Sequence, residues 1–321
     1  MSKYILDFEQ PLEKIEKRIE ELKSTSSNTG VDVSSTLDKL YNDLDSKKKE
    51  IYSNLSRWDR VQLARHPKRP YSSDYISRIT TKWLELHGDR YFGDDTAVIT
   101  GLGEIMGQSF MIIGQEKGRG TKNKLHRNFG MSRPEGYRKS LRLMKLADKF
   151  KIPILTIIDT IGAYPGLGAE ERGQAEAIAR NLFEMGRIKV PIISIVIGEG
   201  ASGGALGIGV ADKILCFENT WYSVISPEGC ASILFRDSTR APEAADAMKV
   251  TANDLYKLGI ADVIIPEPSG AAHLDYDSAA KAMTEALMDE YNKLKLLSEN
   301  DLIKFRLEKY RQMGRWDKLS E

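Results

Sequence analysis

The chain has 321 residues, of which 41% are hydrophobic and 29% charged, and its formal net charge is +1. This near-neutral balance gives no overall attraction to nucleic acid or to a membrane surface, and two cysteines are too few for a disulfide framework or a four-cysteine zinc site. No apolar run reaches the roughly 18 to 20 residues of a membrane span and the charged N-terminus lacks a signal-like core, so the composition predicts a cytoplasmic globular protein.

The first part of the chain, residues 1–70, predicts a helical hairpin. Apolar side chains recur at helical spacing from Phe8, and the stretch at 24–30, which is rich in Ser and Thr and ends in Gly30, is expected to end the first helix. A second apolar stripe continues to Trp58 and is expected to stop at the proline-containing segment 66–70. Such stripes usually pack on the parent domain or on a partner chain, so we do not expect catalysis here.

Residues 71–275 are expected to form the main domain. Asp74 is predicted to cap a short helix that carries Trp83 on its apolar face. Residues 96–114 predict two strands joined by a tight turn, and Pro134 is expected to open the next helix.

The most informative feature is a repeated unit, in which an apolar strand is followed by a loop of small residues and then a helix. The first unit has its strand at 152–158 and its loop at 159–166, and the second has them at 190–197 and 198–204. Short apolar runs that alternate with helices predict buried parallel strands, and open α/β proteins bind ligands at the carboxyl ends of such strands. Loops at helix starts expose N–H groups, so the two units predict a site for two oxyanions.

Two familiar motifs overlap in the second loop, 198–204. Its glycines have the G-x-G-x-x-G spacing of dinucleotide-binding proteins, but only about seven residues separate this loop from the next strand, which is short for a crossover helix. The same loop has the G-x-S-x-G spacing of serine hydrolases, with Ser202 as the nucleophile. His273 is the only later histidine and would have to be the base.

A third interpretation uses only backbone atoms. Gly203 and Gly204 would present N–H groups at a helix start, and Ile161–Ala163 would do so in the first loop. The nearest acids are Asp159 and Glu199, and either is able to fix its loop by accepting backbone N–H groups. No general base stands out, so the base is expected to arrive with the substrate or cofactor.

A cluster of basic residues precedes these units. It contains Lys117, Arg119, Lys122, Lys124, His126 and Arg127. A basic, flexible loop suits the phosphate groups of a nucleotide-bearing substrate or an acidic partner, although a solvated charged loop explains the pattern equally well. Aromatic residues are not interleaved with the charges, so nucleic-acid binding has little support.

Several long motifs resemble the α subunit of the bacterial-type acetyl-coenzyme A carboxylase carboxyltransferase. They are Arg127–Met131, Pro134–Arg138, Asp159–Gly166, Gly168–Gln174, Gly198–Gly204, Tyr222–Leu234 and Ile264–Pro268. The resemblance spans nearly the whole chain. The family usually has proline where Ile161 stands and glycine where Ala201 stands, and neither difference is expected to abolish activity.

This resemblance implies an α/β fold, the crotonase-like (ClpP/crotonase) superhelix of repeated ββα units. The core would be residues 71–275, with the N-terminal hairpin at 1–70 and a C-terminal helical extension at 276–321. The implied reaction moves the carboxyl group from carboxybiotin to acetyl-coenzyme A and gives malonyl-coenzyme A for fatty acid biosynthesis. Biotin would be attached to the biotin carboxyl carrier protein and not to this chain.

The resemblance also implies partners and site residues. A zinc-bearing β subunit would complete the site in an α2β2 assembly, biotin carboxylase would be an indirect partner, and this chain would hold no metal. By analogy with the family, the N–H groups of Gly203 and Gly204 would hold the biotin oxygen while the β subunit holds the thioester oxygen. The implied loop residues are Ile161, Gly162, Ala163, Tyr164, Gly200, Ala201 and Ser202, and Ser202 would be structural. Two alternatives remain at this point: a serine hydrolase using Ser202 and His273, and a noncatalytic crotonase-fold scaffold.

Overall fold

The computed structural model describes residues 4–314, and its centre is a mixed β-sheet. The strands are β1 (Lys82–Glu85), β2 (Val98–Ile105), β3 (Gln108–Gln115), β4 (Ile154–Thr160), β5 (Ile192–Ala201), β6 (Lys213–Phe217), β7 (Trp221–Ser223) and β8 (Val263–Ile265). Their order is β1-β2-β3-β4-β5-β6-β8, with β7 paired to β5. The first three strands are antiparallel and the strands from β3 to β8 pair in parallel, so the predicted parallel units are confirmed.

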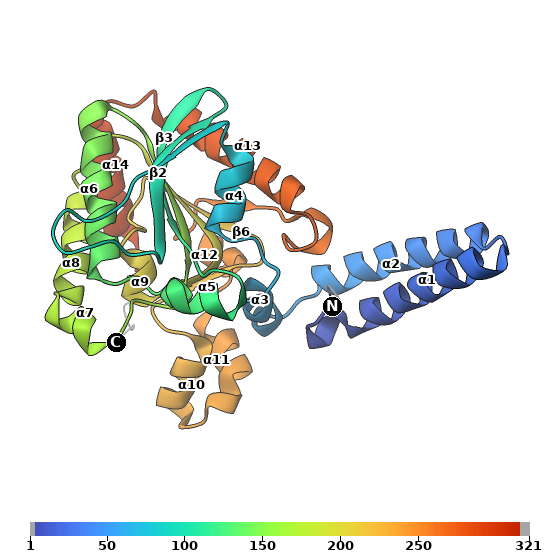
Figure 1. Ribbon diagram of the computed structural model, residues 1–321. Coiled ribbons are helices and arrows are strands. Elements are labelled where there is room, and N and C mark those ends of the chain that lie inside the picture. The colour runs from blue at the N-terminus through green and yellow to red at the C-terminus, as the bar shows by residue number, and fades with distance from the viewer. Residues whose placement is uncertain (1–3, 315–321) are drawn as a thin grey trace, which may run out of the picture.

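Helices cover both faces of this sheet (Figure 1). They are α1 (Gln10–Thr29), α2 (Ser34–Ser53), α3 (Arg57–Ala64), α4 (Ser72–Ile79), α5 (Gly120–His126), α6 (Pro134–Phe150), α7 (Leu167–Glu171), α8 (Gln174–Met185), α9 (Ser202–Leu206), α10 (Pro227–Phe235), α11 (Ala241–Met248), α12 (Ala252–Lys257), α13 (Tyr276–Leu294) and α14 (Glu299–Gln312). Helices α6 and α8 pack on one face, and α4 and α13 on the other, while the α1–α2 hairpin and the α10–α11 pair project away from the sheet (Figure 1). In the described part, 4–314, we find no helix with both the length and the apolar character needed to cross a membrane.

Strand β4 shows why the central strands have continuous apolar sequences. Ile154 and Ile158 join the core cluster under α6 and α8, whereas Leu155 and Ile157 join the cluster under α4 and α13. Successive side chains of a strand point to opposite faces, and here each face is covered, so every position favours an apolar residue.

The N-terminal hairpin differs from the prediction in two details. Helix α1 continues through the Ser/Thr stretch to Thr29, where hydroxyls such as that of Thr25 donate to carbonyls one turn earlier. Gly30 then ends the helix in a left-handed conformation. The second helix ends at Ser53, and Trp58 lies in the separate helix α3. Ser56 starts α3 with a capping box, in which its Oγ accepts the N–H of Asp59 at 3.1 Å.

The segment after α4 was also predicted wrongly. The helix ends at Ile79, and Trp83 lies in strand β1, opposite Gly103 of β2. A Cβ on Gly101 would lie 2.7 Å from the Trp83 ring, so the missing side chain makes room for the indole. Pairing with β2 therefore overrides the local helical periodicity. Asp74 accepts the N–H of Tyr71 at 2.8 Å from the third position of α4, and not as its first cap residue. Residues 315–321 of the predicted C-terminal extension lie outside the described residues.

Candidate functional site

The candidate site forms where β4 and β5 end side by side. Thr160, the last residue of β4, is paired with Gly200 of β5. Strand β5 continues to Ala201, and α9 begins at the next residue, so the predicted loop at 198–204 is wrong in extent. Gly198 and Gly200 lie within the strand, and the helix follows it directly, with Ser202 as its first residue.

The two predicted loops touch through their backbones. A Cβ on Gly204 would lie 2.3 Å from the carbonyl carbon of Gly162 and 2.5 Å from the nitrogen of Ala163, so only glycine permits this approach. The buried side chain of Gln115 joins the same segments, because its Nε2 donates to the carbonyl of Gly204 at 2.7 Å and its Oε1 accepts the N–H of Asp159 at 3.2 Å. The structure therefore brings the two predicted units into direct contact.

The N–H groups of Gly203 and Gly204 lie in the first turn of α9, where N–H groups have no partner within the helix. Ser202 adopts a left-handed conformation with φ of 60°, which turns the chain sharply from strand to helix. A Cβ on Gly203 would first meet Ile178 at 3.7 Å, an ordinary contact. The second unit thus places both predicted donors at a helix start.

The first loop offers fewer free donors than predicted. The N–H of Gly162 donates to Oγ1 of Thr160 at 3.1 Å, and the N–H of Tyr164 donates to the carbonyl of Ser132 at 3.0 Å. Ile161 is exposed at the tip of the loop. These hydrogen bonds hold the loop against the rest of the chain. The loop therefore contributes mainly to the shape of the candidate site and little to its free N–H donors.

Asp159 and Glu199 are both held by Lys117. The Lys117 Nζ lies 2.7 Å from Oδ1 of Asp159 and 2.6 Å from Oε2 of Glu199, and the same Asp159 oxygen accepts the N–H of Glu199 at 3.0 Å. Burial raises the pKa of Asp159. Burial acts on Glu199 in the same direction, but Lys117 and Arg65 outweigh it and lower the pKa of Glu199. Within the described residues, only Asp159 of these two acids accepts a backbone N–H, as the sequence interpretation allowed, whereas the Glu199 carboxylate is held by the side chains of Lys117 and Arg65.

Arg65 and Glu228 belong to the same cluster and were not singled out from the sequence. Arg65 Nε lies 2.6 Å from Oε1 of Glu199, and its guanidinium also binds the carboxylate of Glu228 at the start of α10. Arg65 and Glu199 are 134 residues apart in the chain, so no local pattern could connect them.

The basic segment is not a flexible loop, because residues 120–126 form helix α5. Arg119 donates to the hydroxyl of Tyr276 at 3.0 Å and pairs with Asp74, and Arg127 donates to the carbonyl of Thr96 at 2.8 Å. Together with Lys117, these side chains are already engaged by groups of this chain. Lys122 is exposed and Lys124 is half-buried on α5.

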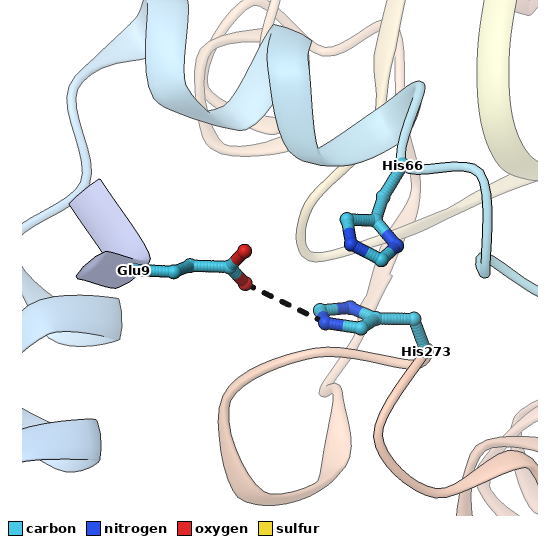
Figure 2. A group of neighbouring side chains, drawn as sticks. All are labelled: Glu9, His66 and His273. Carbon is cyan, nitrogen blue, oxygen red and sulfur yellow. Dashed lines mark ion pairs between the residues drawn. The ribbon is translucent and has the colours of Figure 1, made fainter. Parts of the chain in front are cut away.

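The structure does not bring His273 to Ser202. The His273 ring is buried and stacks on His66 at a centroid distance of 3.9 Å, with its Nε2 3.5 Å from Oε1 of Glu9 (Figure 2). Within residues 4–314 neither ring nitrogen of His273 has a hydrogen-bond partner, so Ser202 has no base in this residue. The serine hydrolase hypothesis is therefore not favoured.

The three side chains of Figure 2 also resemble a metal-binding group, since one ligand atom from each lies within 4.8 Å of the others. Their orientation does not fit an ion. Stacked imidazoles cannot both direct in-plane lone pairs at one metal, and Nδ1 of His66 already accepts the N–H of Lys68 at 3.2 Å. Oε1 of Glu9 also accepts the hydroxyl of Tyr52 at 2.6 Å. We therefore assign this cluster to packing between the base of the hairpin and the main domain.

Comparisons with known proteins identify the family of this chain. Residues 5–314 match the family model described as acetyl co-enzyme A carboxylase carboxyltransferase-like. The chain is 55% identical over 312 residues to the acetyl-coenzyme A carboxylase carboxyl transferase subunit alpha of Flavobacterium johnsoniae, covering 97% of this chain and 98% of the relative. It is 53% identical over 314 residues to the same subunit of Dichelobacter nodosus, covering 98% of each.

Solved structures share the fold at low sequence identity. The chain resembles transcarboxylase 12S with a TM-score of 0.54 and 20% identity, over 68% of this chain and 42% of that one. It resembles a chain of the Pseudomonas malonate decarboxylase hetero-tetramer with a TM-score of 0.59 and 15% identity, over 73% of this chain and 91% of that one. The predicted crotonase-like fold is confirmed. Because the family model and these relatives span nearly the full length, the chain belongs to the acetyl-coenzyme A carboxylase carboxyltransferase α-subunit family.

Proposed function

We propose that this chain provides one half of a site that transfers a carboxyl group from carboxybiotin to acetyl-coenzyme A, giving malonyl-coenzyme A for fatty acid biosynthesis. The observation that supports this most directly is the backbone contact between Gly204 and Gly162, which joins two small-residue segments at the carboxyl ends of neighbouring parallel strands. The proposal also includes the cytoplasm as its location.

In this proposal the N–H groups of Gly203 and Gly204 hold the biotin oxygen. Carboxybiotin, delivered by the biotin carboxyl carrier protein, supplies the carboxyl group and, once that group is released, the basicity that the reaction needs. Hydrogen-bond donors that are fixed before the reaction stabilise the charge of the transition state without rearrangement. The loss of one such donor typically costs about 3 kcal/mol of transition-state stabilisation. Ser202 has a structural role, because its left-handed conformation aims the following N–H groups.

The remaining predicted site residues form the walls of this site in the proposal. They are Ile161, Gly162, Ala163, Tyr164, Gly200 and Ala201. Packing also explains the glycine at position 200, because a Cβ there would lie 2.4 Å from the Tyr222 ring. Of the basic residues, Lys122 and Lys124 are retained as contacts for coenzyme A phosphates or the carrier, because Lys117, Arg119 and Arg127 are engaged within the chain.

We propose that the other half of the site comes from a zinc-bearing β subunit in an α2β2 assembly. An exposed apolar surface on and beside α10 supports a partner chain: Val224, Ile233 and Leu234 are 84%, 70% and 68% exposed. Large exposed apolar side chains that lie close together in sequence are a feature of many protein interfaces. Biotin carboxylase remains an indirect partner, and residues 1–70, 71–275 and 276–321 are the proposed hairpin, carboxyltransferase core and C-terminal extension.

The reverse half-reaction tests the proposal. Malonyl-coenzyme A-dependent carboxylation of biocytin is measured with the purified chain and with the complex that it captures from extracts of its own cells. We expect activity only in the complex, since the thioester oxygen is assigned to the β subunit. An inactive complex that demonstrably contains a β-like chain would contradict the proposal.

A further inference from the structure

Lys117 is a buried lysine at the edge of the candidate site. It follows strand β3, its side chain is only 12% exposed, and its Nζ lies within 2.7 Å of Asp159 and 2.6 Å of Glu199. Burial disfavours its charged form, but the two carboxylates outweigh burial and raise the pKa of Lys117. It therefore stays charged and does not act as a base near neutral pH.

The two carboxylates lie near the carboxyl ends of strands β4 and β5, just before the residues that form the candidate site. Asp159 is the penultimate residue of β4, directly before the loop that contains Gly162, and Glu199 lies two residues before the end of β5. One ammonium group therefore links the ends of three strands, because Lys117 itself follows β3 closely. The N–H of Glu199, donated to Oδ1 of Asp159 at 3.0 Å, adds a direct link between β4 and β5.

The backbone leaves little room for this cluster to shift. A Cβ on Gly198 would lie 2.4 Å from Oδ1 of Asp159, and a Cβ on Gly130 would lie 2.9 Å from Cγ of Lys117. Both glycines thus make space for the charged side chains. Asp159 is paired with Lys117, and Glu199 is paired with both Lys117 and Arg65. Each carboxylate therefore has a cationic partner.

We propose that Lys117 is a positioning residue for carboxyl transfer, holding Asp159 and Glu199 so that the Gly162 and Gly204 backbones meet in the reactive arrangement. This inference rests on the proposed function. Lys117 itself contacts neither substrate nor cofactor in this role. Small displacements of catalytic groups cost up to about 100-fold in rate, whereas substrate affinity depends on contacts spread over a wider surface.

The test uses Lys117→Met in the complex of this chain with its captured β subunit. We expect kcat for biocytin carboxylation to fall by about 100-fold while KM for malonyl-coenzyme A changes little. Lys139→Met is the matched control. Lys139 is also buried, and its Nζ contacts Asp94 at 2.6 Å and the carbonyls of Asp95 and Val98, not the site acids. This control is expected to lower stability while retaining kcat.

A charge-balanced double variant, Lys117→Met with Asp159→Asn, separates the effect of Lys117 on the placement of the site backbone from its effect on the stability of the fold. The Asp159→Asn side chain retains an oxygen that accepts the N–H of Glu199, and the double variant has the same net charge in the cluster as the wild type. We expect its Tm to recover relative to Lys117→Met while kcat remains low. Recovery of kcat together with Tm, or an equal kcat loss in Lys139→Met, would overturn the inference. An inactive wild-type complex would instead refute the proposed function, so the two failures are distinguishable.

Discussion

The backbone of Gly204 lies against the backbone of Gly162, at a distance that excludes any side chain on Gly204. This contact depends on parallel pairing of β4 and β5, which aligns Ile154 with Ile192 and brings both strands to their carboxyl ends at the same edge. The two glycines are 42 positions apart in the chain. A pair of separate small-residue turns thereby becomes one surface of backbone groups.

Gly204→Ala is expected to separate the two segments. The new Cβ would meet backbone atoms at 2.3 and 2.5 Å, which are unable to rotate away, so we expect a loss of about 1–3 kcal/mol in the free energy of unfolding and little remaining carboxyltransferase activity. Thermal unfolding and biocytin carboxylation measure the two effects.

Gly203→Ala is the matched comparison, because its Cβ has only ordinary contact with Ile178 at 3.7 Å. We expect its Tm to stay near that of the wild type and its activity to fall less than that of Gly204→Ala, since alanine keeps the N–H group and leaves the contact between the two segments intact. Full activity of a folded complex with bulky residues at both Gly203 and Gly204 would favour a noncatalytic scaffold.

Ser202→Ala is expected to keep most of the transferase activity. The proposed role of Ser202 lies in its backbone conformation, and His273 is buried beside His66 and Glu9 and gives it no base. A serine nucleophile would lose nearly all activity on this change. Labelling of Ser202 by a fluorophosphonate probe would contradict the expectation.

Arg306→Met is expected to destabilise the fold strongly. The Arg306 guanidinium is fully buried in α14, lies 2.7 Å from Asp212 and donates to the carbonyls of Met185, Ile188 and Val190. Its removal leaves the Asp212 charge and these carbonyls without their partner, at a cost of about 3–5 kcal/mol. Urea unfolding measures the loss.

Lys281→Ala provides the control for that experiment. Lys281 and Glu285 form an ion pair 3.9 Å apart on α13, with side chains 78% and 65% exposed. Exposed ion pairs of this kind contribute at most about 1 kcal/mol to the free energy of unfolding. Equal losses for Arg306→Met and Lys281→Ala would show that burial of the Arg306 network contributes nothing.

Mild acid is expected to destabilise the chain through His66. Burial lowers the pKa of His66 from 6.5 to about 3, and the stacked His273 ring acts in the same direction. The unfolded chain therefore binds a proton below pH 6.5 that the folded chain does not, so stability is present above that pH and declines as the pH falls. Between about pH 7 and about pH 5.5 this residue contributes a loss of about 1 kcal/mol in the free energy of unfolding.

His66→Phe keeps a ring for stacking but has no titrating group, so we expect its stability to fall less over the same pH interval. The exposed His126 offers the comparison, and His126→Phe is expected to follow the wild type. Urea unfolding at the two pH values provides the measurement. An unchanged pH dependence in His66→Phe would contradict the assignment.

Local patterns predicted those elements whose structure depends on nearby residues. The apolar runs of β4 and β5 and the helix opened by Pro134 all form, since burial on both faces and a fixed proline φ act within a few residues. The helical periodicity predicts a helix at Trp83, but the residue lies in a strand because it pairs with Gly103, 20 positions away, and local periodicity does not depend on strand pairing.

The motifs of the chain identified the family and, through that resemblance, implied the crotonase-like fold, while the apolar runs predicted the parallel strands. Long ordered motifs and periodic apolar runs are properties of the chain that need no coordinates. The contacts of Lys117 with Asp159 and Glu199, and the stacking of His273 on His66, became visible only in the folded chain. These relationships join residues far apart in the chain, and the paired strands and packed helices alone bring them within hydrogen-bonding or van der Waals distance.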